Sequence, residues 1–270
     1  MSKCIEITVN GPVAVLRLYK PPVNALDEPS LRELGKAVQQ VEEDSSVRAV
    51  IVVSALEGIF CAGGDLKYWP RLYRNRADEI TEAARCAFVP IEQLTKPSIA
   101  AIQGHVIGDG LSLALACDIR LAAQGVTFQL PEIGYGFIPG WGTIGRLVRV
   151  IGTALATELL LVGEPINAAR AQTIGLVNRV AAPDDLLPAA EDLAERLSAK
   201  PPTAMRHAKA ALFNGSAAAW RDQEDWEARC FAAVWGNQEW EHGIRKLFGR
   251  ATVTDQERVD EGLDRTSEML

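Results

Sequence analysis

The chain has 270 residues, of which 48% are hydrophobic and 23% are charged, and it carries a formal net charge of −7. Such a length can bury a sizeable core in one large domain or in two small ones. The acidic balance, with no basic stripe to offset it, argues against a nucleic-acid partner.

The start of the chain and its cysteines indicate where the protein works. MSKCIEITVNGP lacks the apolar core of a signal peptide, and the most apolar stretch, 97–123, is interrupted by polar and charged residues too often to span a bilayer. The five cysteines are odd in number and show no C-x-x-C spacing, which is typical of incidental or buried thiols in a reducing compartment. We expect a cytoplasmic protein with no membrane partner.

Strand and helix patterns alternate in the first half of the chain. Strands are expected over 4–10, 13–19, 48–54, 97–102, 119–123 and 126–128, and helices over 30–45, 79–94 and 111–118. The first of these helices places Leu31, Leu34, Val38 and Val41 on one face. The repeated order of strand, helix and strand indicates an α/β core.

Helical patterns dominate from about residue 140 onward. Helices are expected over 144–151, 156–162, 167–174, 187–199 and 203–213, with one strand signal at 175–180. Near the end, two helical faces carry large apolar side chains: Trp226, Cys230, Phe231 and Val234, and then Trp240, Ile244, Leu247 and Phe248. Such faces suit either a core or a subunit contact.

Two glycine-rich stretches each follow an apolar strand and precede a helical pattern. They are FCAGGDLK at 60–67 and GHVIGDGLSLALACD from residue 104. Backbone N–H groups at such turns are unpaired donors, and two facing turns would present two of them to one oxygen, as an oxyanion hole does. Two tight turns without chemistry would explain the glycines equally simply. Neither stretch fits a nucleotide-binding pattern.

Three motifs together resemble the crotonase (enoyl-CoA hydratase/isomerase) superfamily: FCAGGDLK, GHVIGDGLSLALACDIRLAA and FQLPEIGYGFIPGWGTIGRL, in that order. The resemblance runs from VNALD near residue 24 to KLFGR near residue 250. It implies an α/β fold of stacked β-β-α turns, a spiral core over 1–200 that carries CoA and the active site. It also implies a helical region over 201–250 that builds homotrimers, often paired into hexamers. A polar tail, solvated or disordered, covers 251–270.

The resemblance also implies an acyl-CoA thioester as substrate, with no metal and no other cofactor. In the family, two backbone N–H groups stabilise the thioester enolate, and here these belong to Gly64 and Asp109. Asp118 resembles a structural hydrogen-bonding residue, and Trp69 either lines the acyl pocket or belongs to the core. The candidate substrate and CoA contacts are Val23, Ala25, Ala62, Gly63, Asp65, Leu66, Lys67, Tyr68 and Trp141. Of these, Asp65 also fits a structural role, and Lys67 fits either a phosphate contact or a solvated lysine.

One departure from the family pattern bears on the reaction. Hydratases of the family use two glutamates, which jointly hold a water and manage its proton. The first falls on Ser112 here, and the second is retained as Glu132. Serine is not a base at pH 7 without an activating group, and no histidine lies within a helical turn of Ser112 in sequence.

A single carboxylate above an enolate hole suffices for a 1,3-proton shuttle that moves a double bond. Burial of Glu132 against Leu130, Ile133 and Trp141 would raise its pKa toward working pH and improve it as a base. The simpler interpretation is a surface or cap glutamate, since P-E also suits the first turn of a helix.

Asp109 stands where family members usually have glycine. Aspartate is a good N-cap and a helix begins here, so we favour a cap over direct chemistry. If its carboxylate faces the acyl pocket instead, Asp109 would serve as a second acid. Ser112 either bonds back to a helix carbonyl or orients a water or substrate oxygen.

The sequence thus favours an isomerase-type enzyme with Glu132 as acid and base. A hydratase (lyase) compensated by Ser112 or Asp109 is the first alternative. A decarboxylase or C–C lyase acting on an acyl-CoA is the second, because loss of CO₂ generates an enolate without a base. A non-catalytic binding protein of crotonase fold is an alternative of another class.

Overall fold

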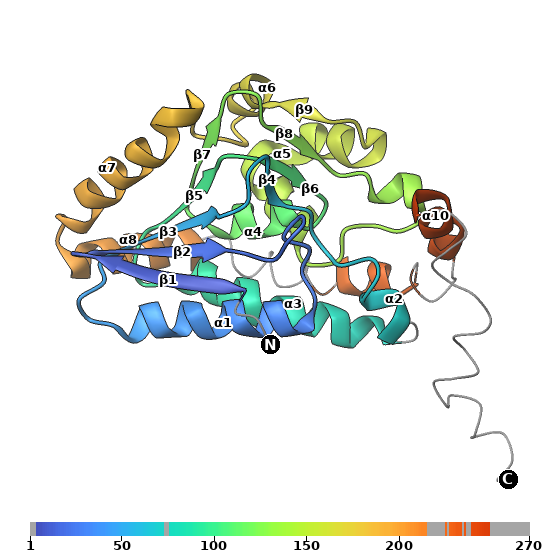
Figure 1. The fold of residues 1–270 in the computed structure, drawn as a ribbon, viewed down its shortest axis with the longest axis horizontal. Coiled ribbons are helices and arrows are strands. Elements are labelled where there is room, and N and C mark those ends of the chain that lie inside the picture. The colour runs from blue at the N-terminus through green and yellow to red at the C-terminus, as the bar shows by residue number, and fades with distance from the viewer. Residues whose placement is uncertain are drawn as a thin grey trace, which may run out of the picture.

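A six-stranded sheet forms the centre of the protein in the computed structural model, which describes residues 4–72, 76–214, 225, 227–233, 235 and 239–248. Its strands run in the order β1-β2-β3-β5-β7-β10 (Figure 1). The pair β1 and β2 is antiparallel, and every other neighbouring pair is parallel. The bounds are β1 Ile5–Asn10, β2 Val13–Leu18, β3 Ala49–Ser54, β5 Ser98–Ile102, β7 Ile119–Ala123 and β10 Arg179–Ala181. The predicted α/β class is confirmed.

A second sheet of four short strands was missing from the prediction, although the strand expected over 126–128 corresponds to one of its members, β8. It consists of β4 (Ile59–Cys61), β6 (His105–Ile107), β8 (Thr127–Gln129) and β9 (Ile166–Asn167), in that order. The pairs β4–β6 and β6–β8 are parallel, and β8–β9 is antiparallel. The two glycine turns therefore follow β4 and β6 rather than the long strands β3 and β5. Strands of two or three residues are too short to show an alternation pattern.

The helices enclose these sheets. Helix α7 packs against β2, β3, β5 and β7, while α1 lies along α3 and contacts β1. Helix α4 connects the second sheet to α3 and α5. The helices that carry the argument are α1 (Glu28–Glu43), α3 (Ala77–Gln93), α4 (Gly110–Ala116), α5 (Thr143–Val162), α7 (Leu186–Ser198) and α10 (Glu239–Phe248). The others are α2 (Trp69–Leu72), α6 (Ala168–Thr173), α8 (Pro202–Asn214), η1 (Glu132–Tyr135) and η2 (Pro183–Asp185).

Helix α1 shows how the sequence specifies its own boundaries. Asp27 accepts a hydrogen bond from the Ser30 backbone N–H, and the Ser30 hydroxyl accepts one from the Asp27 N–H, which completes a capping box. The apolar face predicted for this helix is confirmed, because Leu31, Leu34, Val38 and Val41 are all buried.

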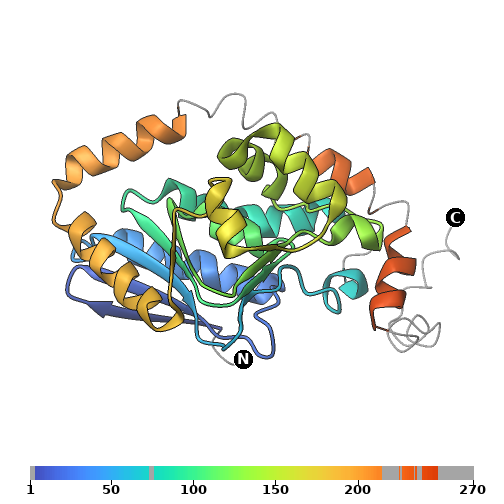
Figure 2. The ribbon, with the colours of Figure 1, turned by 90° about the horizontal axis from the view of Figure 1, so that it is seen from above.

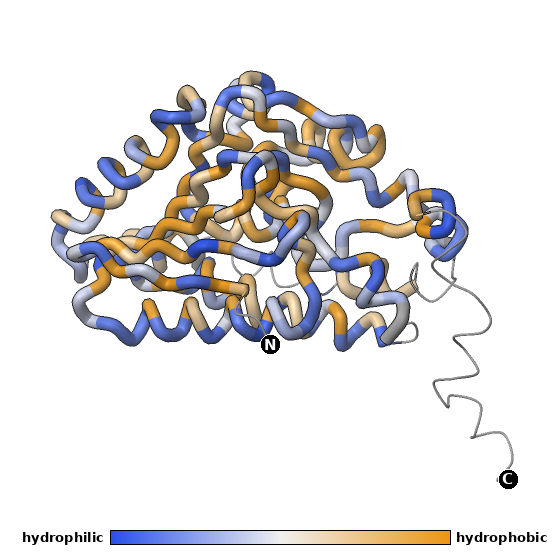
Figure 3. Tube along the Cα trace, viewed as in Figure 1, coloured by the Kyte–Doolittle hydropathy of each residue, from blue (hydrophilic) through white to orange (hydrophobic). Residues whose placement is uncertain are grey.

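The apolar core follows the central strands. Every residue of β3 is buried, as expected for a strand covered on both faces. Figure 3 shows the apolar residues gathered along these strands, whereas polar and apolar residues alternate along α1 and α7. In the part of the chain that the structure describes, no helix is both long enough and apolar enough to cross a membrane.

Most of the described C-terminal aromatic side chains are buried against the rest of the same chain. Phe231, Trp240 and Ile244 are buried, whereas Leu247 and Phe248 of α10 remain partly exposed. Two members of the predicted faces, Trp226 and Val234, lie outside the described residues, as does the tail predicted over 251–270. Seen from above, α10 lies at the end of the molecule opposite to α7 and α8 (Figure 2). A subunit contact through this region stays a prediction.

Candidate active site

The second sheet brings the three sequence motifs together. Its strands β4, β6 and β8 are parallel neighbours, so their carboxyl ends meet at one edge. Gly63 and Gly64 follow β4, Gly108 and Asp109 follow β6, and Glu132 follows β8. Ligands of open parallel sheets bind outside such strand ends, which makes this edge the candidate active site.

The two glycine turns approach each other closely. Gly63 has a φ of +77°, and a Cβ built on it would lie only 2.8 Å from the backbone nitrogen of Asp109. A side chain at position 63 would therefore be strained and would push the turns apart. Glycine is required here because the two backbones are nearly in contact.

The N–H groups of Gly64 and Asp109 have no acceptor among the described residues. Leu26 accounts for this at Gly64, since its N–H donates to the Gly63 carbonyl at 2.7 Å and its carbonyl accepts from the Asp65 N–H at 2.9 Å. These bonds use the groups on either side of Gly64 and leave its own N–H unpaired. Unpaired N–H groups on adjoining turns are the arrangement that an oxyanion hole requires.

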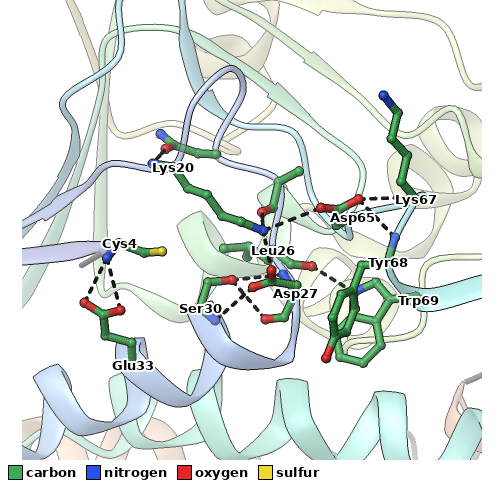
Figure 4. A network of polar contacts seen from close by, with 12 residues as sticks. Cys4, Lys20, Leu26, Asp27, Ser30, Glu33, Asp65, Lys67, Tyr68 and Trp69 are labelled. Atoms are coloured by element: carbon green, nitrogen blue, oxygen red, sulfur yellow. Dashed lines mark hydrogen bonds and ion pairs between the residues drawn. The ribbon is translucent and has the colours of Figure 1, made fainter. Parts of the chain in front are cut away.

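A network of polar side chains holds the first glycine turn, at residues 63–64, in place (Figure 4). Lys20 Nζ donates to the Ala25 carbonyl at 2.7 Å and forms ion pairs with Asp27 at 2.8 Å and Asp65 at 3.5 Å. Asp65 Oδ1 accepts the backbone N–H groups of Lys67 and Tyr68 at 3.0 and 3.2 Å. The interpretation of Asp65 as a structural hydrogen-bonding residue is confirmed, and its carboxylate is occupied by the turn itself.

Asp118, the other predicted structural aspartate, has the same kind of role. Its Oδ2 accepts the backbone N–H of Ser98 at 2.7 Å and the Ser98 hydroxyl at 3.0 Å, and it pairs with Lys209. This prediction is confirmed as well.

The predicted CoA segment lies along the first motif. The Val23 carbonyl accepts the Ala62 N–H at 3.1 Å, and Val23 itself is exposed. Lys67 is also exposed, and its Nζ lies 5.4 Å from the centre of the Phe248 ring. Ala25, Ala62, Leu66 and Tyr68 are partly buried.

Buried Asn24 was missing from the sequence-based list. It has a φ of +50°, and its amide donates to the Ser54 hydroxyl and the Phe60 carbonyl at 2.8 and 3.0 Å. These bonds tie the segment to β3 and β4. The signal for Asn24 in the sequence was its place in the VNALD stretch, where the family resemblance begins.

Glu132 is a buried carboxyl with a free oxygen. Only 4% of the residue is exposed, and Oε2 has no hydrogen-bond partner among the described residues. Burial raises the pKa of Glu132 well above its usual value, and the charge of Asp109 raises it further. The surface interpretation is therefore wrong, whereas the expected place of Glu132 in the first turn of a helix is confirmed, since it begins η1.

The surroundings of Glu132 match the expectation in part. Leu130 and Trp141 are buried, but Ile133 is 39% exposed, so it does not help to desolvate the carboxyl as expected. Gly108 supplies the close wall instead, since a Cβ there would lie 2.5 Å from Glu132 Oε1. The residue preceding Asp109 thus adjoins Glu132, which places the carboxyl beside the second glycine turn.

The cap interpretation of Asp109 is wrong. Its side chain makes no capping bond, because its backbone is already helical (φ −63°, ψ −3°) rather than extended as an N-cap requires. Asp109 Oδ1 instead accepts the Thr143 hydroxyl at 2.7 Å, and the backbone N–H groups of Gly140 and Trp141 act to lower the pKa of its carboxyl. Burial raises its pKa to about 6, although these hydrogen bonds oppose the shift.

Ser112 is occupied by a structural network. Its hydroxyl donates to the Trp141 carbonyl at 2.8 Å and accepts from Arg146 Nη1 at 3.0 Å. It therefore does not bond back to a carbonyl of its own helix, as one expectation had it. Arg146 in turn forms a buried two-point ion pair with Glu92, at 2.9 and 3.0 Å.

Aromatic rings form the wall beside Gly64. A Cβ at Gly64 would lie 3.2 Å from the Trp141 ring. Trp69 and Phe88 pack against the same ring, with centroids 5.9 and 6.0 Å away. Trp69 and Trp141 therefore belong to the core and lie beside Gly64, and their lining of an acyl pocket stays a prediction.

Comparisons with known proteins identify the family of the chain. A sequence profile of the enoyl-CoA hydratase/isomerase family matches residues 8–251. The chain is 41% identical over 217 residues to the enoyl-CoA hydratase/isomerase YngF of Bacillus subtilis, covering 80% of this chain and 84% of that protein. It is 36% identical over 233 residues to a crotonyl-CoA hydratase of Syntrophomonas wolfei, covering 86% and 90%.

A solved structure supports the fold in the same way. The enoyl-CoA hydratase of Bacillus anthracis matches with a TM-score of 0.76 and 32% identity, over 93% of this chain and 98% of that one. The fold and the three joined motifs define an enzyme of the crotonase superfamily. Within it, the chain belongs to the enoyl-CoA hydratase/isomerase family.

The role of Ser112 leads to a first prediction. Ser112→Ala removes a buried hydrogen bond and one acceptor of Arg146, so it should lower the free energy of unfolding by about 1–2 kcal/mol. Acyl-CoA turnover should fall less than tenfold. Urea unfolding and steady-state kinetics measure the two effects, with exposed Ser45→Ala as the control. Unchanged stability together with a hundredfold loss of turnover would instead make Ser112 catalytic.

Proposed function

We propose that the protein is an enoyl-CoA isomerase-type enzyme in which Glu132 moves a proton between two carbons of an acyl-CoA. One observation supports this most strongly. The Glu132 carboxyl is buried with Oε2 unpaired, and it adjoins the turn that carries the free Asp109 N–H. A base and two donors for a developing oxyanion thus adjoin one another.

The reaction follows from these parts. Ionised Glu132 takes a proton from C2 of a 3-enoyl thioester, and the electron pair moves onto the thioester oxygen to give a dienolate. The N–H groups of Gly64 and Asp109 stabilise that oxygen, and each such donor is typically worth about 3 kcal/mol of barrier. The electrons then return, and Glu132 delivers the same proton to C4, which leaves a 2-enoyl thioester. No water is consumed.

Burial of Glu132 favours this chemistry. A carboxyl with its ordinary pKa is a weak base at neutral pH, and the raised pKa brings its basicity closer to that of the enolate.

A specific observation favours a second candidate, an enoyl-CoA hydratase. Asp109 carries a buried carboxyl that acts on the pKa of Glu132, and it lies one helical turn before Ser112. Its carboxylate therefore supplies a second acid near the position of the missing glutamate. The named relatives of Syntrophomonas wolfei and Bacillus anthracis are hydratases. In this candidate Asp109 and Glu132 together hold the attacking water.

The remaining features of the proposal follow the family. In this proposal coenzyme A lies along Val23, Ala25 and the 62–68 segment, and the exposed Lys67 pairs with one of its phosphates. The acyl-CoA is a substrate and needs no further cofactor. Homotrimers or hexamers in the cytoplasm remain part of the proposal, with the partly exposed Leu247 and Phe248 of α10 available for contact.

Glu132→Gln tests the base directly. It keeps the shape of the side chain but cannot accept the proton, so turnover of 3-enoyl-CoA should fall by about 10²–10⁴-fold. The measurement is the appearance of 2-enoyl-CoA by NMR and mass spectrometry. The control is Glu158→Gln, on the exposed side of α5. Full turnover by Glu132→Gln would overturn the proposal.

Asp109→Asn separates the two candidates. Asparagine still accepts hydrogen bonds from the 140–143 segment, and the backbone N–H at position 109 is unchanged. Isomerisation should therefore fall less than tenfold, whereas hydration by a two-acid mechanism should fall by about 10²-fold or more. Products formed in D₂O decide: a shifted double bond without hydroxyl supports the isomerase, and a 3-hydroxyacyl-CoA supports the hydratase. Malonyl-type thioesters are tested if neither product forms.

A further inference from the structure

The C-terminal helical segment packs against the loop that carries Glu132. Gly243 of α10 has no room for a Cβ against the Tyr135 carbonyl, and Gly140 has none against the Phe231 ring. The rings of Trp235 and Phe137 meet edge to face with centroids 6.4 Å apart. The loop from η1 to the start of α5 is thus contacted along its length by Phe231, Trp235 and α10.

Glu227 belongs to the same helical face as these contacts. Positions 227, 231 and 235 are four residues apart, so their side chains point to one side of the helix. Phe231 and Trp235 are buried against the loop, and Glu227 extends the same row to the first turn of α5. A carboxyl is the one group in this row that is not apolar.

The Glu227 carboxyl is buried and only half satisfied. The residue is 4% exposed, Oε2 accepts the Gly145 backbone N–H at 3.0 Å, and Oε1 has no partner in the described part of the chain. Gly145 lies in the first turn of α5, directly after the residues that hold Asp109. Glu227 and Asp109 thus accept hydrogen bonds from the same short segment, residues 143–145.

We propose that Glu227 is a positioning residue of the active site. It fixes the first turn of α5, so that the Thr143 hydroxyl keeps the Asp109 carboxyl in place, and ionisation of Glu227 adds a negative charge near Asp109. The inference rests on the proposed function, because it takes Asp109 and Glu132 as parts of the site.

Electrostatics gives this role a pH dependence. The charged groups that act on Glu227 are Asp109, which disfavours its ionisation, and Arg146, which favours it. Burial is the largest effect and raises the pKa of Glu227 to about 8, against the N–H groups of Gly145 and Gly142. Glu227 is therefore largely neutral at pH 7 and becomes a second anion beside Asp109 at pH 9.

A double-mutant cycle tests the coupling without any substrate. Urea unfolding is measured at pH 6 and pH 9 for the wild type, Glu227→Gln, Asp109→Asn and the double variant. At pH 9, Glu227→Gln removes a repelled charge, so it should shift the unfolding midpoint upward more when Asp109 is present than when it is replaced. At pH 6 the two effects should add. Additivity at both pH values would overturn the proposal.

Kinetics tests the effect on the site. Glu227→Gln keeps an acceptor for Gly145, so kcat at pH 7 should stay within about twofold of wild type. In this variant the inflection that the pH profile of kcat/KM shows between pH 7 and 9 in the wild type should disappear. Glu227→Ala removes the acceptor and should lower kcat about tenfold with little change in KM, and Asp225→Asn on the exposed side of the same helix is the control.

The outcomes separate this inference from the proposed function. A wild-type pH profile retained by Glu227→Gln overturns the positioning role even if the variant is less stable. If the wild type turns over no acyl-CoA, the proposed function is wrong, and the unfolding cycle alone then supports or overturns the coupling between Glu227 and Asp109.

Discussion

The rest of the site depends on the close approach of three parallel strand ends in the second sheet. The strands β4, β6 and β8 are short, and they place two glycine turns and one carboxyl at a single edge. Gly63 and Gly108 permit this, since a side chain on either would collide with the neighbouring motif. Backbone N–H groups set this way need no reorganisation when an oxyanion forms, which is where most of the catalytic benefit of such a hole arises.

The site concentrates buried acids, and this has a cost in stability. Burial raises the pKa of Asp109 to about 6 and of Glu227 to about 8, and it raises that of Glu132 as well. A folded-state pKa above the unfolded value, which is about 4 for carboxyls, means that the native state keeps protons longer. These groups contribute stability fully below that value, and the contribution is lost as pH rises through each folded-state pKa. Within the described part of the chain, Arg146, the start of α5 and the N–H groups of Gly140 and Trp141 offset the buried charges of Asp109 and Glu227.

The sequence predicted the α/β class, the buried face of α1 and the turns at Gly64 and Asp109, because each leaves a local pattern of period, cap or glycine. It missed the short strands β4 and β6, whose pairing depends on neighbours far away in the chain. The cap prediction for the side chain of Asp109 was wrong for a related reason. Its partners at 140–143 come from another motif, and local cap preference says nothing about them. Glu227 left no signal, since its role arises only when a distant helix packs on the loop.

The central claim is that Glu132 removes an α-proton from the thioester and that two backbone N–H groups stabilise the resulting enolate. Its most direct measurement follows α-proton exchange of a saturated thioester, butyryl-CoA, in D₂O by NMR, because this substrate can neither isomerise nor add water. The account predicts deuterium at C2 with the wild type and a loss of about 10²-fold or more in the exchange rate with Glu132→Gln. Exchange at the wild-type rate in Glu132→Gln, or none with the wild type, would contradict it.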